Sequence, residues 1–297
     1  MIPSPGHSHR ARVELRFWEW PGDPPPALLL HGIGNYGRYW DALAHEIRGR
    51  LRLVAPDARG HGDSGKPDRG YTSAELVADA LAVLDTLAVE RALVVGHSMG
   101  GTHALRLSND HPDRVLALVL VDVGPESMRE GTDRARRLTL TRPESFADRE
   151  EALAYLRMTS PGYEDEVYAG RLEHAFRQEH GPLPTDPARL VWRSSSAALA
   201  QIMAARTAPE EQWAGLRSIR CPLLIVRGSR SNVLAPSTAD RMRRERSVAQ
   251  PGVRTQLLEL DAGHNVALER PRELAEKIVE LARSVAATPG SMRRWIP

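Results

Sequence analysis

At 297 residues, of which 41% are hydrophobic, the chain is long enough for one large domain or one domain with an insertion, built around a sizeable core. Its 40 basic residues, all but two of them arginine, nearly balance 38 acidic residues and are interspersed with them, which disfavours a nucleic-acid-binding surface. Because no apolar run reaches the roughly 18 residues of a membrane span and residues 1–11 lack the apolar stretch of a secretory signal, we expect a cytoplasmic protein with no nucleic-acid or membrane partner.

The first part of the chain alternates between segments of strand and helix character. Residues 13–20 alternate in polarity as an edge strand does, and the apolar run 27–30 is typical of a buried strand in a parallel sheet. Ser73 has the position of a helix N-cap, since apolar residues follow it at helical spacing. The elements predicted up to this point are strands at 13–20, 27–30 and 51–56 and helices at 39–48 and from residue 73 onwards.

The next predicted strand leads directly into a glycine-flanked serine. An apolar run at 92–95 is followed by Gly96-His97-Ser98-Met99-Gly100 and then by residues of helical character. This is the pattern of a nucleophile elbow, a tight strand-to-helix turn that holds a reactive serine. The glycines have a physical reason, because a side chain two residues before or after the serine would collide with the neighbouring strand or helix. Ser98 is therefore the predicted nucleophile.

Three further apolar segments complete the predicted sheet. Strands are predicted at 115–121, 222–228 and 253–260, and a closing helix runs from residue 273 to about 284. Strands that alternate with helices indicate an α/β fold with a doubly wound, mostly parallel sheet, whose sites lie at the carboxyl ends of the strands.

The long segment between the strands predicted at 115–121 and 222–228 differs from the rest of the chain in its sequence pattern. It is amphipathic, rich in Arg, Glu and Ala, and broken by prolines, and it contains no strand-like apolar run. So many residues between adjacent strands indicate an inserted helical cap over the strand ends. The predicted organisation is a core in two parts, 1–123 and 216–286, with the cap at 124–215 and a C-terminal tail at 287–297.

A serine nucleophile needs a base, and His264 is the best of the 11 histidines. It follows the last predicted strand, at the carboxyl edge where Ser98 also lies. His103 lies a little over one turn into the helix after the elbow, a position more typical of a packing residue. His97 is expected to help hold the turn, and His61 is a weaker competitor in a loop.

Four motifs occur in the order typical of one family. They are His31-Gly32-Ile33 with Trp40 beyond, the loop Asp57-x-Arg59-Gly60-His61-Gly62-x-Ser64, Gly96-His97-Ser98-Met99-Gly100-Gly101, and Gly263-His264. On these motifs the chain resembles the α/β-hydrolase superfamily, and within it the capped serine esterase and lactonase branch.

The resemblance has three implications for the site. The backbone N–H groups of Met99 and Ile33 would form an oxyanion hole, which binds the negatively charged oxygen of the reaction intermediate. The loop 57–64 would be mainly structural and support the site. Relatives that act as haloalkane dehalogenases or epoxide hydrolases use an aspartate at the elbow, so Ser98 argues against both activities.

The acid that orients the base is the member of the triad that the sequence leaves open. The resemblance places it a few residues after Gly228, where Asn232 stands, and a neutral amide cannot stabilise an imidazolium ion. Asp122 ends the strand that follows the nucleophile's helix, at the same edge of the sheet, and some members of the superfamily carry their acid there. We therefore predict Asp122 as the acid, with Asp261 and Glu126 as weaker alternatives.

Together these assignments predict a serine hydrolase that cleaves small to medium apolar esters or lactones through an acyl-enzyme on Ser98. No cofactor is expected, and neither a zinc-binding spacing nor a phosphate-binding loop occurs. Five side chains of the predicted cap are candidates for an apolar substrate lining, with packing between cap helices as the alternative role of each. They are Trp192, Trp213, Met158, Met203 and Tyr163.

Two other kinds of function remain open at this stage. Related folds host C–C bond hydrolases and cofactor-free oxygenases, and a carboxylate-binding arginine facing Ser98 would favour a C–C bond hydrolase of keto-acids. A ligand-binding receptor on a hydrolase scaffold is the non-enzyme alternative, favoured by Asn232 and disfavoured by the intact Ser98, His264 and oxyanion motif. The sequence specifies neither the natural substrate nor the oligomeric state.

Overall fold

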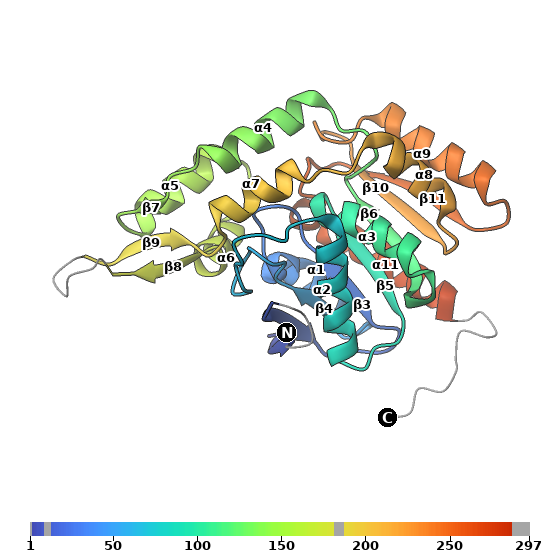
Figure 1. Cartoon of the computed structure of the whole chain (residues 1–297), viewed down its shortest axis with the longest axis horizontal. Helices are drawn as coiled ribbons and strands as arrows, with labels where there is room; N and C mark the ends of the chain where they lie inside the picture. Colours follow the sequence, from blue (N-terminus) through green and yellow to red (C-terminus); the bar gives the residue numbers. More distant parts are fainter. Residues whose placement is uncertain (1, 9–12, 181–186, 287–297) are drawn as a thin grey trace.

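The core of the molecule is an eight-stranded, mostly parallel sheet (Figure 1), as the sequence predicts. The computed structural model describes residues 2–8, 13–180 and 187–286. The six strands from β4 to β11 in the spatial order run parallel to one another, whereas β2 pairs antiparallel with both β1 and β4. In spatial order the strands are β1 (Ser4–Ser8), β2 (Leu15–Trp20), β4 (Leu53–Pro56), β3 (Ala27–Leu30), β5 (Ala92–His97), β6 (Val115–Val121), β10 (Leu223–Gly228) and β11 (Thr255–Leu260).

The outermost strand, β1, is an element that the sequence analysis did not predict. The prediction placed the edge of the sheet at residues 13–20, but β2 is covered on its outer side by β1, with Ser4 opposite Glu19 and Ser8 opposite Leu15. The segment Ser4–Ser8 carries no apolar alternation, so its pairing rests on backbone hydrogen bonds that a hydrophobicity pattern does not reveal.

Helices cover both faces of the sheet, and each face has its own apolar core. One face carries η1 (Gly37–Trp40), α1 (Asp41–Ile47), α10 (Val266–Glu269) and α11 (Pro271–Ala286). The other carries α2 (Ser73–Thr86), α3 (Met99–Asp110), α8 (Pro209–Ser218) and α9 (Pro236–Ala249). A short η2 turn (Pro112–Arg114) joins α3 to β6.

The start of α2 differs from the prediction by one residue. Thr72, not Ser73, is the N-cap, and it forms a capping box in which its side chain accepts from the Glu75 amide while the Glu75 carboxylate accepts from the Thr72 amide. Ser73 is the first helical residue, and its hydroxyl lies 3.0 Å from His103 Nδ1.

The segment between β6 and β10 is not entirely helical, contrary to the prediction. Residues 129–204 are called the insert hereafter, and those of them that the structure describes form four helices and a three-stranded antiparallel sheet in the order β7-β9-β8. The strands are only two to four residues long and each includes a polar residue, which is why no continuous apolar run marks them. The elements are α4 (Arg129–Leu140), β7 (Ser145–Phe146), α5 (Arg149–Thr159), α6 (Asp165–His174), β8 (Phe176–Glu179), β9 (Arg189–Trp192) and α7 (Ser196–Ala204).

The insert forms a separate layer above the large sheet in the view of Figure 1. Its own apolar cluster includes Phe146, Leu156, Tyr168 and Phe176. The predicted cap ends at residue 215, within helix α8. This helix belongs to the core, because Trp213 and Leu216 are buried in the same apolar cluster as residues of α3 and α9.

None of the helices in the described part of the chain is both long enough and apolar enough to cross a membrane.

Candidate active site

Ser98 lies at the turn between β5 and α3 in a backbone conformation that side-chain-bearing residues rarely adopt, with φ 51° and ψ −120°. A Cβ at Gly96 would lie 2.5 Å from the carbonyl oxygen of Gly100, and a Cβ at Gly100 would collide with the carbonyl oxygen of Leu30. The structure therefore shows the collisions with the helix and the neighbouring strand that the glycine pattern predicts. Ser98 itself remains half-buried at the carboxyl edge of the sheet.

Asp122 and His264 are brought together at the same edge. Asp122 directly follows β6 and is fully buried, and His264 lies in the loop after β11. His264 Nδ1 is 2.7 Å from Asp122 Oδ2. Since a carboxylate can only accept, the proton of a neutral His264 ring lies on Nδ1, and Nε2 keeps a free lone pair. This is the tautomer that a general base requires.

The Asp122 carboxylate is held in place by two further hydrogen bonds. Its Oδ1 accepts from the Gly228 amide at 3.0 Å, and its Oδ2 accepts from the Ser231 hydroxyl at 2.5 Å. The residue has a positive φ of 48°, and its own amide donates to the carbonyl oxygen of Val226. These contacts fix the orientation of a buried charge that His264 faces.

One residue of the loop after β10 reaches the Asp122 carboxylate. It is Ser231, which the sequence analysis did not single out. The Asn232 side chain points to Glu130 of α4, with Nδ2 3.4 Å from Oε1, and does not contact His264. The role of Ser231 is not visible in the sequence, because counting from Gly228 does not reveal which side chain of a tight loop turns inward.

The two alternative acids lie elsewhere. The Asp261 carboxylate is held by Arg230 and Arg270. Glu126 accepts from the Trp213 indole at 2.8 Å and from Arg241 at 3.0 Å. Neither contacts His264, so Asp122 is the carboxylate that the structure pairs with the candidate base.

His97 connects the elbow to the loop of His264. Its Nε2 donates to the carbonyl oxygen of His264 at 2.9 Å, and the two imidazole rings lie 4.6 Å apart. On its other side the ring stacks on Tyr39, with centroids 5.2 Å apart. Burial, and then the neighbouring His264, hold the pKa of His97 well below its usual value. His97 is therefore a neutral residue that joins the two loops.

The Ser98 hydroxyl forms no hydrogen bond with any described residue. Its link to His264 runs through the adjacent His97, whose side chain bonds the His264 backbone. Hydrogen bonds between a nucleophile and its base are often loose before substrate binds and tighten in the reacting complex.

The two candidate oxyanion donors lie on either side of the elbow. Ile33 follows β3, and Met99 is the first residue of α3. A Cβ at Gly32 would lie 3.3 Å from Ser98 Cβ, so the loop of Ile33 approaches the candidate nucleophile closely. Neither the Ile33 amide nor the Met99 amide donates to a described residue. Both N–H groups are therefore free to bind an anionic oxygen.

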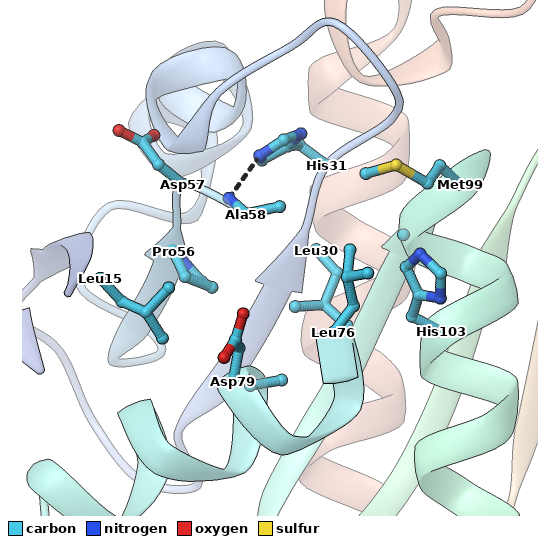
Figure 2. Close-up of a pocket in the computed structure, with 12 residues that line it drawn as sticks. Leu15, Leu30, His31, Pro56, Asp57, Ala58, Leu76, Asp79, Met99 and His103 are labelled. Carbon is cyan, nitrogen blue, oxygen red and sulfur yellow. Dashed lines mark hydrogen bonds between the residues drawn. The ribbon is translucent and has the colours of Figure 1, made fainter. Parts of the chain in front are cut away.

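The loop 57–64 supports this arrangement through hydrogen bonds. His61 Nε2 accepts from the Gly34 amide at 3.0 Å, next to Ile33, and His31 Nε2 accepts from the Ala58 amide at 3.0 Å (Figure 2). Burial lowers the pKa of His31 to about 4 and keeps that of His61 well below its usual value, so both rings are neutral acceptors. His61 is thus a supporting residue and not a base.

The predicted substrate lining is only partly located near the site. Tyr163 lies beside it, because its hydroxyl accepts from Asn265 Nδ2 at 2.7 Å. Trp192 packs in the aromatic cluster of the insert, 4.3 Å from the Phe176 ring. Trp213 is buried in the sheet core, and Met158 is 72% exposed, so neither lines the site. Met203 is half-buried on α7.

A small apolar cluster that the sequence analysis missed covers the oxyanion residues. Ala198 and Ile202 of α7 are buried with Tyr71, and the side chains of Ile33 and Met99 pack against them. Ala198 and Ile202 are four residues apart and so share one face of the helix. This spacing is visible in the sequence, but it does not indicate which surface the face covers.

Two cavities in the described residues do not open directly on Ser98. One has a volume of about 30 Å³, which is too small for an organic substrate, and lies behind the elbow between Met99, Leu76 and His103 (Figure 2). The other, of about 210 Å³, is a polar cleft between the core and the insert, lined by residues that include Arg38, Asp63 and His174.

Comparison with known proteins gives a consistent assignment. The family description that matches is that of alpha/beta hydrolases, over residues 27–277. The chain is 29% identical to the 2-(acetamidomethylene)succinate hydrolase of Mesorhizobium japonicum over 72% of this chain and 74% of that protein. It is 28% identical to the 3-hydroxybutyrate-oligomer hydrolase of Cupriavidus necator over 92% of each. An esterase of Mycobacterium tuberculosis is 29% identical over 91% of this chain and 85% of the relative.

Solved structures agree with these relatives. The structure of an E-2-(acetamidomethylene)succinate hydrolase has a TM-score of 0.79 at 26% identity and covers 94% of this chain and 98% of that one. The Mycobacterium tuberculosis esterase has a TM-score of 0.73 at 25% identity, with 97% and 93% covered.

Proposed function

The chain belongs to the alpha/beta hydrolase family, and from that premise we propose that it is a serine hydrolase that cleaves carboxylic esters or lactones through an acyl-enzyme on Ser98. The observation that carries the proposal is the hydrogen bond of 2.7 Å between His264 Nδ1 and the buried Asp122 carboxylate, beside an elbow serine. A base held in this tautomer beside such a serine is the arrangement that nucleophilic acyl transfer requires.

In the first half of the reaction, His264 Nε2 takes the proton of the Ser98 hydroxyl as its oxygen attacks the substrate carbonyl. The ring becomes an imidazolium ion, which the Asp122 carboxylate stabilises. The amides of Ile33 and Met99 donate to the oxygen on which negative charge develops. The tetrahedral intermediate then collapses, and His264 gives its proton to the departing alcohol oxygen.

In the second half, water replaces the alcohol. His264 takes a proton from the water as it attacks the acyl carbon, the same amides bind the oxyanion, and the proton returns to Ser98 as the acid is released. The chemistry needs no group beyond these side chains and amides.

The substrate assignment is supported by the surroundings of the site and by the relatives. Ala198 and Ile202, packed on Ile33 and Met99, provide an apolar surface beside the proposed oxyanion hole, and we propose that the insert acts as a cap that encloses the substrate there. Two of the relatives are an esterase and a hydrolase of 3-hydroxybutyrate oligomers.

The relatives also differ in the charge of what they act on. One is a hydrolase of 2-(acetamidomethylene)succinate, and succinate derivatives carry carboxylates. The pairing of Asp122 with His264 supplies the carboxylate that Asn232 cannot, which favours a hydrolase over a receptor without turnover.

The test is hydrolysis of p-nitrophenyl butyrate by the wild type and by Ser98→Ala. We expect the substitution to lower kcat/KM by about 10⁴-fold or more and to abolish labelling by a fluorophosphonate, measured by intact mass. Ser247→Ala, at an exposed position of α9, is the control and should behave as wild type. If Ser98→Ala kept its activity while its circular dichroism and melting temperature matched the wild type, the nucleophile assignment would be wrong.

A further inference from the structure

Among the half-buried arginines in the described part of the insert, Arg193 pairs with Asp63, but two others have no carboxylate partner. They are Arg142, in the turn after α4, and Arg171, on α6. Both are half-buried. A buried cation without an anion is costly unless something else compensates its charge, so the surroundings of each are informative.

Arg142 is held rigidly by neutral groups. Its Nη1 donates to Ser194 Oγ at 2.9 Å, its Nη2 donates to the Ser194 carbonyl oxygen at 2.8 Å, and Nη2 and Nε both approach Ser196 Oγ. The guanidinium lies 4.6 Å from the centre of the Trp192 ring. Burial lowers the pKa of Arg142 to about 10, which leaves it charged at neutral pH.

Arg142 also lies close to the oxyanion side of the site. Ser194 and Ser196, which hold Arg142, lie at the start of α7. Ala198, less than one helical turn further on, belongs to the buried cluster against which Ile33 and Met99 pack. The Ser195 amide donates to the carbonyl oxygen of Gly60, which ties this turn to the loop of His61. Arg142 is one of the charges that lower the pKa of His61, after burial and His31.

Arg171 lies on the opposite side, towards His264. Helix α6 packs with Tyr36, Tyr155 and Tyr163 in one cluster, and Tyr163 bonds Asn265, the neighbour of His264. Burial raises the pKa of each of these tyrosines, and the charge of Arg171 opposes it in all three.

Two tyrosines connect these arginines to each other and to the triad. Burial raises the pKa of Tyr155, and the charges of both Arg142 and Arg171 oppose this rise. The Tyr39 hydroxyl is buried without a hydrogen-bond partner, and both Asp122 and Arg171 influence its pKa, which burial raises. Tyr39 also stacks on His97. Helix α6 contacts Tyr163, which bonds Asn265, and the turn that holds Arg142 bonds Gly60, so the two arginines belong to the parts of the insert that contact the loops of His264 and His61.

We propose that Arg142 and Arg171 form a carboxylate-binding subsite of the insert, so that the natural substrate is an ester whose acyl or alcohol part carries a carboxylate. This inference rests on the proposed function. Guanidinium groups bind carboxylates through charge-assisted hydrogen bonds. Arg171 has its donors free for a paired contact, whereas Arg142, most of whose donors bind Ser194 and Ser196, contributes mainly its positive charge. The apolar surface of Ala198 and Ile202 then contacts the carbon chain between the ester and the carboxylate.

The test compares matched anionic and neutral esters. For the acyl part, p-nitrophenyl hemisuccinate is compared with p-nitrophenyl pentanoate. For the alcohol part, 4-acetoxybenzoate is compared with phenyl acetate. We expect the wild type to prefer at least one anionic ester. Arg142→Met and Arg171→Met should lower the anionic-to-neutral ratio of kcat/KM by about 10- to 100-fold, mainly through KM, whereas Arg149→Met, exposed at the start of α5, should keep the wild-type ratio.

Three outcomes decide the inference. A wild type that hydrolyses the neutral esters and prefers neither anionic ester overturns the subsite but not the hydrolase. If both methionine variants lose kcat/KM equally on anionic and neutral esters, the arginines only hold the insert together. In that case Arg142→Lys and Arg171→Lys, which keep the charge, should have the melting temperature of the wild type. If no ester of either kind is hydrolysed in a Ser98-dependent manner, the proposed function itself is wrong.

Discussion

At the scale of single residues, the site depends on two strained positions at adjacent strand ends. Ser98 after β5 and Asp122 after β6 both have positive φ, at 51° and 48°. Such conformations cost of order 1–3 kcal/mol each and persist because the surroundings determine them. Hydrogen bonds from Gly228 and Ser231 hold the Asp122 side chain, and the crowded glycines hold the turn at Ser98.

The role of Asp122 predicts a large and specific loss of rate on Asp122→Asn. An amide keeps the volume but reverses the preference of His264 for the Nδ1 proton, and we expect kcat to fall by about 10⁴-fold. Asn232→Ala should change kcat by less than about threefold, because its side chain faces Glu130 and not His264. Steady-state kinetics on p-nitrophenyl butyrate checks both. A larger effect at Asn232 than at Asp122 would reverse the acid assignment.

The candidate nucleophile, base, acid and oxyanion residues could be named from the sequence because motifs fix their order along the chain and strand ends fix their edge of the sheet. Ser231 could not be named, since the inward side chain of a short loop depends on its backbone turn. Nor could the arginine pair, because strand β7 and helix α5 separate Arg142 from helix α6, which carries Arg171, and no sequence pattern indicates how they pack.

At the scale of elements, the core and the insert differ in how far the sequence determines them. The buried strands β3, β5, β6 and β10 were predicted within one or two residues because continuous apolar runs mark them. Strand β1 carries no apolar alternation, and the strands of the sheet β7-β9-β8 are only two to four residues long, too short for a period to be recognised. The prediction of an all-helical insert fails for this reason.

Helix α7 is the element expected to set chain-length preference. Ile202 is buried on Ile33 and Met99, so Ile202→Ala should open space beside the acyl group. We expect the ratio of kcat/KM for p-nitrophenyl hexanoate over acetate to rise by about tenfold. Met158→Ala, at a position 72% exposed, is the control and should leave the ratio as it is.

The same assay separates α7 from the aromatic cluster of the insert. Trp192→Ala should lower the melting temperature rather than change the chain-length ratio, because Trp192 packs on Phe176 and not on the oxyanion residues. An Ile202→Ala profile that matches the wild type, in a folded protein, would contradict the position of α7 over the acyl group.

At the scale of the whole molecule, the buried histidines couple stability to pH. His31 and His103 have their pKa lowered by burial to about 4, and His61 and His97 lie well below the usual 6.5. Between pH 6.5 and 4 the unfolded chain binds protons at these positions that the folded protein does not, so the free energy of unfolding decreases as pH falls. Asp57 acts in the opposite direction, because burial raises its pKa to about 6 and the folded state takes up its proton first.

Burial also raises the pKa of Asp79, which acts in the same direction as Asp57. Since the four histidines outnumber these two carboxyls, we expect the free energy of unfolding to be highest above pH 6.5 and to decrease steadily towards pH 5. Each excess proton bound by the unfolded chain contributes about 1.4 kcal/mol per pH unit. Urea denaturation at pH 7.5, 6.5, 5.5 and 5.0 measures the slope. His103→Gln removes one of the titrating groups at a site away from the triad, where the ring contacts Ser73, and should make the slope shallower by about one proton. A free energy of unfolding that stays constant or rises from pH 6.5 to 5 would mean that the histidines are not buried in their neutral form.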